Sequence, residues 1–234
     1  MRGDQQLVET FAELTRSWYL ADPGVIAQQM TAAAAELVPG GEEAALCLLT
    51  RHGQIVPAAA TSDPVAAADR LWHATDAGPC PVAIRDGGVH QVPDLLEDDR
   101  WPDVSRRAEQ VSGLRCVLTL PIAAGTQMLG ALTLAARSPR AFGPSSVTLG
   151  GALALHGALA LSGAATRARN TELTEALRSN RLIGMALGIV MNQRRVTAQQ
   201  AFEVLRRSSR HRHRKIHDLA AEIVETGEVP DGRA

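Results

Sequence analysis

The sequence predicts an α+β protein: an N-terminal antiparallel sheet bracketed by helices, joined by one long helix to a C-terminal bundle of three helices. Three observations support this fold class. Runs of strand-forming residues alternate with amphipathic segments over the first 137 residues. Few helix breakers interrupt 144–193, and apolar residues recur at helical spacing in three stretches between 180 and 229. With 234 residues, 45% of them hydrophobic, the chain can bury the cores of one medium and one small domain.

The N-terminal part alternates helices and strands in an order that brackets a sheet. The strands at 44–50 and 54–61 are expected to form a hairpin through His52-Gly53, and those at 115–124 and 127–137 turn at Gly125. Helices are expected over 4–20, 22–37, 64–75 and 82–85, and an acidic loop followed by a helix over 97–114.

Each of the three C-terminal stretches has one apolar stripe. Thr197 stands three residues before Gln200, a capping-box pattern in which each side chain satisfies a free backbone N–H at the helix start. Gly227 stands where the last helix would end. The stripes consist of Ile183, Ala186, Leu187 and Val190, then Ala201, Val204 and Leu205, then Ile216, Leu219, Ala220, Ile223 and Val224.

Basic residues concentrate in the same part of the chain. Nine of them lie between 181 and 217, where only Glu203 opposes them, although the whole chain has a formal net charge of −1. Such polarisation is typical of a polyanion binder, because fixed cations displace the counterions condensed on phosphates. The alternative is a solvated helical face. The basic residues are Arg181, Arg194, Arg195, Arg206, Arg207, Arg210, Arg212, Arg214 and Lys215, with His211, His213 and His217 among them.

The C-terminal stretch resembles an ANTAR domain, the three-helix RNA-binding module of bacterial antitermination regulators. The resemblance rests on IGMALGIVM (183–191), TAQQAFEVLRRSS (197–209) and RHRHRKIHDLAAEIV (210–224). It implies binding to paired hairpins in a leader RNA, so that a transcription terminator fails to form. We expect Arg206, Arg210, Arg214 and Lys215 to contact the RNA, with Ala186, Gly188, Ala201 and Phe202 shaping the surface.

Several of these positions have a structural alternative. Phe202 is expected in the core rather than as a base-stacking platform, and Gly188 serves either close helix packing or close backbone approach. The chain departs from the family pattern at Leu187, where many members carry Lys, and at His213, where many carry Asn. An Arg or His can still stack on an unpaired base, so these departures affect the expected RNA sequence more than RNA binding itself.

Residues 23–162 resemble a GAF domain, a small-molecule-sensing fold. The matching motifs are GPCPVAIRDG, VPDLLEDDRWPDV, LRCVLTLPI and LGALTLAARSPRAFGPSSV. The resemblance allows a small-molecule ligand without naming it, and the cofactor is left unknown. A pocket would lie between the sheet and the loops that hold Cys80, His90, Asp98 and Trp101, although Trp101 also suits a loop anchor.

The three cysteines are far apart in the sequence and odd in number. This argues against a disulfide framework or a paired CxxC zinc site, and neither a catalytic nor a metal site is assigned. Cys47 and Cys116 are expected to be small core residues. Cys80 follows a Gly-Pro turn in an expected loop, which makes it the best candidate for a reactive thiol.

The predicted organisation is an N-terminal helix (1–22), a GAF sensor domain (23–162), an ANTAR domain (163–229) and a tail (230–234). The first ANTAR helix is expected to continue from the last GAF helix, and to pair with its copy as a coiled coil in a homodimer. The start of the chain is not of signal-peptide type and no uninterrupted membrane span is found, so a cytoplasmic location is expected.

We therefore interpret the chain as a signal-responsive RNA-binding regulator that prevents transcription termination, rather than an enzyme. Two alternatives stay open. One is a GAF-type, thiol-dependent free methionine sulfoxide reductase, since the chain has three cysteines. The other is a DNA-binding regulator with a helix-turn-helix, against which the connection RHRHRK (210–215) is expected to be too long and too charged.

Overall fold

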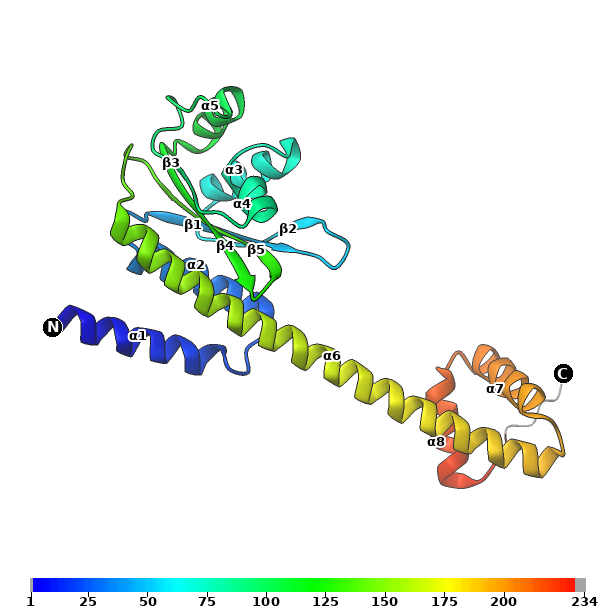
Figure 1. Ribbon diagram of the computed structural model, residues 1–234. Helices are drawn as coiled ribbons and strands as arrows, with labels where there is room; N and C mark the ends of the chain where they lie inside the picture. Colours follow the sequence, from blue (N-terminus) through cyan, green and yellow to red (C-terminus); the bar gives the residue numbers. More distant parts are fainter. Residues whose placement is uncertain (1, 230–234) are drawn as a thin grey trace. The chain divides into compact units, whose positions relative to one another are not determined.

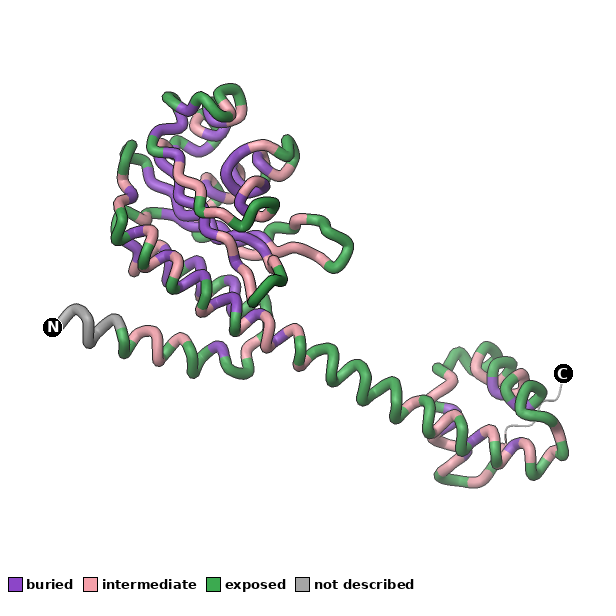
Figure 2. Tube along the Cα trace, viewed as in Figure 1, coloured by how far each residue is buried: buried purple, intermediate pink, exposed green. Residues whose placement is uncertain are grey.

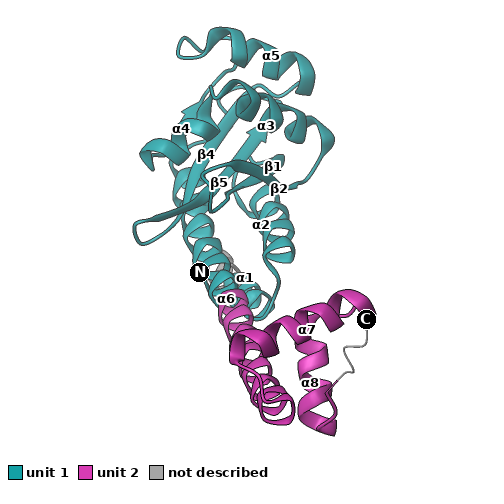
Figure 3. Cartoon of the chain, turned by 90° about the vertical axis from the view of Figure 1, so that its right-hand side faces the viewer, with its two compact units in different colours: residues 1–166 teal, residues 167–234 magenta. Residues whose placement is uncertain are grey.

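The structure, a computed structural model, describes residues 2–229, with side chains from Val8 onward. The predicted tail, 230–234, lies outside the described residues. The chain divides into two compact units, Met1–Thr166 and Arg167–Ala234 (Figure 3). The α+β fold class is confirmed: a five-stranded antiparallel sheet with helices, then a long helix and two further helices.

The sheet of the first unit has the strand order β2-β1-β5-β4-β3, and every neighbouring pair is antiparallel. The predicted hairpin is present, with Leu49 opposite Ile55. So is the second, where Ala124 pairs with Gln127 around Gly125, which has a positive φ. The strands are β1 (Glu43–Leu49), β2 (Ile55–Ala60), β3 (His90–Val92), β4 (Cys116–Ala124) and β5 (Gln127–Ala136).

Helices cover both faces of this sheet (Figure 1). Successive residues of a strand point to opposite faces, so Leu118 and Leu120 join one core while Val117, the residue before Leu118, joins the other. The first core lies under α2 (Pro23–Leu37) and the N-terminal part of α6 (Pro144–Arg194). The second lies under α3 (Asp63–Thr75), α4 (Pro79–Asp86) and α5 (Pro102–Ser112).

The N-terminal helix α1 (Arg2–Trp18) packs onto α6 through one histidine. The ring of His156 lies 5.3 Å from that of Trp18 and 5.6 Å from that of Phe11, and its Nε2 is 2.8 Å from the Thr15 hydroxyl. Burial lowers the pKa of His156 below its ordinary value, because the interior disfavours the charged ring. The packing of α1 against α6 therefore favours the neutral form of the His156 ring.

The predicted long helix is confirmed as α6, which spans 51 residues. It is also long and apolar enough, by length and composition alone, to cross a membrane. Its apolar part has another role, since Leu153, Ala154, Ala158 and Leu161 are buried against the sheet. The stretch after the sheet is polar and exposed from Ala168 to Arg178 (Figure 2).

The end of α6 forms a bundle with α7 (Ala198–Arg212) and α8 (Ile216–Thr226). The predicted capping box at the start of α7 is confirmed: Thr197 accepts from the N–H of Gln200, and the Gln200 side chain accepts from that of Thr197. Gly227 ends α8 in the left-handed conformation, as predicted. The predicted stripes meet in one core, whose fully buried residues are Ala186, Val190, Ala201, Leu205, Ala220 and Ile223.

Candidate nucleic-acid interface

One face of α7 carries an aromatic residue followed by two arginines. Phe202, Arg206 and Arg210 are spaced four residues apart, so they lie on one stripe of the helix, and all three are exposed. The expectation that Phe202 belongs to the core is wrong, since 39% of the residue is exposed. The neighbouring Ala201 and Leu205 fill the small core instead, which leaves Phe202 on the outer side of α7.

The turn between α7 and α8 presents further basic residues. Helix α7 continues through Arg212, and α8 begins at Ile216, so the connection is residues 213–215 alone. The expected long connection is therefore wrong. Arginine is a good helix former, and cations in the last turn stabilise the negative end of the helix dipole. His213 ends α7 in the left-handed conformation and donates its N–H to the carbonyls of Ser209 and Arg210.

Two of the four arginines and lysines expected to contact RNA are already paired with carboxylates. Arg214 pairs with Glu222, which also lies 3.6 Å from Arg212, and Arg206 lies 3.1 Å from Glu203. Glu222 follows the basic segment by several residues, so the sequence count of opposing charges missed it. Among the described residues of α7 and the α7–α8 turn, three exposed cations make no ion pair: Arg207, Arg210 and Lys215.

The small residues expected to shape the surface divide into two kinds. Ala186 and Ala201 are fully buried in the bundle core, so their side chains determine how closely α6 and α7 approach rather than touching a ligand. Gly188 is exposed on α6, and a Cβ built there would have nothing within 4 Å. Close helix packing within the described chain therefore does not explain this glycine.

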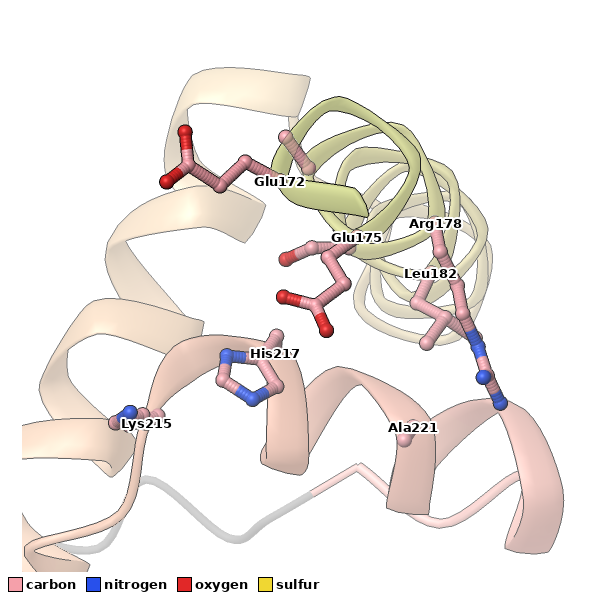
Figure 4. Close-up of a pocket in the computed structure, with 9 residues that line it drawn as sticks. Glu172, Glu175, Arg178, Leu182, Lys215, His217 and Ala221 are labelled. Atoms are coloured by element: carbon pink, nitrogen blue, oxygen red, sulfur yellow. The ribbon is translucent and has the colours of Figure 1, made fainter. Parts of the chain in front are cut away.

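A groove of about 710 Å³ runs between α6 and α8 within this unit (Figure 4). Lys215 in the α7–α8 turn and His217 on α8 line one wall, while Glu172, Glu175 and Arg178 on α6 line the other. The Glu175 carboxylate points toward the His217 ring (Figure 4). The groove thus has mixed charge, in contrast to the outer face of α7.

In the sensor unit, the four expected pocket residues have separate partners. His90 lies 2.9 Å from the Asp86 carboxylate, which also accepts from the N–H of Gly88. Asp98 is buried and accepts from Ser105 and from the N–H of Trp101. Trp101 packs against the second core, and the Arg100 guanidinium lies 4.7 Å from the centre of its ring. These contacts anchor the loop before α5.

Cys80 has a different environment from the one expected. It belongs to α4, which begins three residues earlier than predicted, and it is fully buried rather than in an exposed loop. Its Sγ lies 3.1 Å from that of Cys47 on β1. Cys47 and Cys116 are buried, as predicted, but on opposite faces of the sheet. No local pattern indicates that Cys47 and Cys80 meet, because 33 residues separate them.

Two residues of α3 complete this cluster. The Nε2 of His73 lies 2.9 Å from an oxygen of the buried Asp69, one turn earlier on the helix. Burial by itself would lower the pKa of His73, but hydrogen bonds with Asp69 and Cys47 outweigh it and raise the pKa to about 10. The hydrogen bond with Cys80 lowers the pKa of Cys47 to about 7, while the same contact and burial raise that of Cys80.

Two family profiles match the chain. That of the GAF domain matches residues 21–162, and that of the ANTAR domain matches residues 171–224. The chain belongs to the GAF family and carries a C-terminal ANTAR domain. A sensor domain followed by the domain of an antitermination family makes this GAF–ANTAR chain a signal-responsive regulator.

Solved structures are similar to the GAF part of the chain. The free methionine-R-sulfoxide reductase of Neisseria meningitidis has 15% identity and a TM-score of 0.53, with 67% of this chain and 89% of that chain covered. A bacteriophytochrome from R. palustris has 11% identity and a TM-score of 0.52, with 78% and 42% covered. A GAF domain/HD domain protein from Geobacter sulfurreducens has 22% identity and a TM-score of 0.48, with 61% and 94% covered. No curated protein sequence matches the chain. At these identities the likeness concerns the fold alone.

Proposed function

We propose that this GAF–ANTAR protein binds paired hairpins in a leader RNA through the outer face of α7 and the α7–α8 turn, and thereby prevents transcription termination. The observation that carries the proposal is the exposed stripe of Phe202, Arg206 and Arg210 on α7, followed in the α7–α8 turn by the exposed Lys215, which makes no ion pair. Free arginines and lysines supply attraction to phosphate. An exposed aromatic ring supplies a stacking surface for an unpaired base.

Hairpin loops suit this surface better than a regular RNA duplex does. The major groove of A-form RNA is too deep and narrow for side chains to read, whereas loop bases are unstacked and accessible. Residues of the turn are also held in place, because the Ser209 hydroxyl donates to the carbonyl of Arg214 at 2.5 Å. A preorganised turn loses little conformational freedom when it binds.

The sensor acts on the RNA-binding unit through α6. This helix begins against the sheet and ends in the bundle without interruption. A continuous helix can transmit a rotation or a shift in register, which a flexible tether cannot. The domain limits 1–22, 23–162 and 163–229 are part of this proposal, with the signal entering within 23–162.

The protein acts as a homodimer paired along α6, so that two bundles face two hairpins. Five large apolar side chains are exposed on this helix: Leu155, Leu159, Leu173, Leu177 and Met185. Leu159 and Leu173 are two heptads apart, the spacing that a coiled coil requires. Changing Leu173 and Leu177 to Glu is expected to give a monomer in sedimentation analysis with unchanged helicity. A dimer that persists would contradict pairing along this stretch.

The RNA-binding test compares two double variants of the full-length protein. Arg210→Gln with Lys215→Gln removes the two free cations of the proposed surface, and Arg51→Gln with Arg107→Gln removes the same charge from exposed positions of the sensor domain. Binding to an RNA with two tandem hairpins is measured across a salt series. We expect the first variant to bind at least about 10-fold more weakly, with the salt slope reduced by roughly 1–2. The second variant is expected to bind like the native protein.

Two outcomes would overturn the proposal. Equal weakening by both double variants would mean that overall charge, not this surface, attracts the RNA. Equal or tighter binding to a duplex DNA of the same length would favour a DNA-binding regulator, an alternative that the short α7–α8 turn keeps open. A Phe202→Leu variant then separates stacking from charge, because it keeps an apolar side chain but removes the ring.

We propose that the protein is not an enzyme and that it is cytoplasmic. The similar structure of a methionine sulfoxide reductase concerns the fold only, and Cys80 is fully buried, whereas a thiol that attacks a substrate needs access to it. Turnover of free methionine sulfoxide by the native protein, lost on Cys80→Ser, would overturn the first statement.

A further inference from the structure

Four potential metal ligands meet on the α3–α4 side of the GAF sheet. They are Cys47 on β1, Asp69 and His73 on α3, and Cys80 on α4. One ligand atom from each lies within 4.8 Å of the other three. The two sulfurs are 3.1 Å apart, and the His73 and Asp69 atoms are 2.9 Å apart.

The fold brings these residues together by three separate means. Cys47 alternates with Leu46 on β1, so its side chain points to the face that α3 and α4 cover. Asp69 and His73 are one helical turn apart and therefore share a face of α3. Gly78, the residue before α4, lies so close to Trp72 that a Cβ on it would be 2.5 Å from a ring atom. This close approach positions the start of α4 and with it Cys80.

The surroundings of the cluster are apolar, and some of its buried polar atoms lack a hydrogen-bond partner. Val65, Ala68, Trp72 and Leu95 belong to the same buried core as the two cysteines. Within the described residues, Asp69 Oδ1 and His73 Nδ1 are buried and have no hydrogen-bond partner. Buried polar atoms without a partner are rare in folded proteins, and each calls for an explanation.

A single metal ion would account for the donor set. Two sulfurs, an imidazole nitrogen and a carboxylate oxygen are ligands of zinc, which binds sulfur at about 2.3 Å and nitrogen or oxygen at about 2.0–2.2 Å. Two atoms that bind one such ion are therefore at most about 4.6 Å apart, and two sulfurs in tetrahedral geometry are about 3.8 Å apart. The sulfurs need to separate only slightly from their 3.1 Å contact. Magnesium and calcium prefer oxygen ligands alone, and iron–sulfur clusters take four cysteines.

We propose that Cys47, Asp69, His73 and Cys80 bind one zinc ion in the GAF domain. With four protein ligands the site is closed, and closed zinc sites are structural. The ion ties strand β1 to α3 and α4, so it fixes how these helices pack on the face of the sheet where the sensor pocket is predicted. This role is independent of the proposed RNA binding.

The experiment uses the full-length protein, reduced and freed of metal by a chelator, with zinc or cobalt(II) as the probe. The native protein is expected to bind one zinc per chain. Cobalt is expected to give the strong visible bands of a tetrahedral ion and a thiolate-to-cobalt charge-transfer band. Cys47→Ser and Cys80→Ser are expected to lose the charge-transfer intensity and to weaken zinc binding at least 100-fold.

Two matched controls come from the chain itself. Cys116→Ser removes the third buried cysteine, which lies in the other core, and is expected to leave the cobalt spectrum unchanged. His211→Gln with His213→Gln removes exposed histidines of the bundle and is expected to leave one zinc per chain. Circular dichroism of every variant establishes that it is folded.

Several results would overturn the proposal. The proposal would be wrong if the reduced native protein bound no cobalt, or if the cobalt spectrum lacked the thiolate-to-cobalt charge-transfer band. Loss of zinc in the bundle-histidine variant would assign the metal to surface histidines. A reduced chain without zinc affinity that forms a Cys47–Cys80 disulfide in air would make the two thiols a redox pair instead.

Discussion

The two units of the molecule carry their polar residues in opposite ways. The C-terminal bundle has a small core, in which three of the six fully buried residues are alanines, and it exposes its arginines and lysines. The sensor domain has two cores on either face of a sheet and buries Cys47, Asp69 and Cys80 in one of them. The proposed RNA would be bound by exposed charge on a small scaffold. The proposed zinc ion would be bound by groups that a larger scaffold holds away from water.

The largest expected effect is the local unfolding of the C-terminal bundle, which has the smaller core. Leu205→Ala and Leu118→Ala each remove a fully buried leucine, one from the bundle and one from the sheet core, at a cost of about 2–5 kcal/mol. A core as small as that of the bundle rarely supplies more than about 3–5 kcal/mol. We therefore expect Leu205→Ala to unfold α7 and α8 locally, which hydrogen exchange would detect as lost protection there.

Leu118→Ala serves as the matched comparison. The sheet core extends over many more buried residues, so this variant is expected to melt at a lower temperature while the strands keep their protection. Full protection of α7 and α8 in Leu205→Ala would mean that the bundle is not the less stable unit.

A second, smaller effect concerns the exposed charges alone. Glu222→Gln releases Arg214 and Arg212 from their carboxylate partner and removes a negative charge near the proposed RNA surface. Exposed ion pairs contribute only about 0.2–1 kcal/mol, so RNA affinity should rise by roughly 3-fold. Glu225→Gln is the control, because Glu225 is an exposed glutamate of the same helix that takes no part in these pairs. Weaker binding by Glu222→Gln would mean that this pair positions Arg214 for the RNA.

The smallest expected effect depends on pH and separates buried from exposed histidines. The pKa of His156 is lowered in the folded state, so the unfolded chain takes up the proton first. Stability is therefore full above pH 6.5, the ordinary value, and falls as the pH drops below it. Between pH 7.5 and 5.5 the native protein should therefore lose more in Tm than a His156→Phe variant.

The exposed histidines of the bundle provide the comparison for this prediction. His211→Gln with His213→Gln is expected to leave the pH dependence of the melting temperature as it is in the native protein, because both side chains are exposed. An equal pH dependence in the native and His156→Phe proteins would mean that the docking of α1 does not depend on the neutral ring.

Much of the fold could be predicted because the patterns that encode it are local. The stripes of α7 and α8, the capping box at Thr197 and the end of α8 at Gly227 each depend on residues within one or two helical turns. The strand hairpins depend on short turns in the same way. Local patterns failed at helix ends: α4 begins at Pro79, and α7 continues through the basic run to Arg212.

The sequence by itself determined the order of the elements and the concentration of positive charge near the C-terminus, because spacing and charge can be read along the chain. Only the tertiary structure decided that Phe202 is exposed, so that the stripe it shares with Arg206 and Arg210 lies on the outer side of α7, and that Glu222 pairs with Arg214. It also brought Cys47 to Cys80 and to the pair on α3. The one local signal was the spacing of Asp69 and His73, one helical turn apart. The physical reason is that contacts between residues far apart in the chain depend on how strands and helices pack, and no periodicity along the sequence records them.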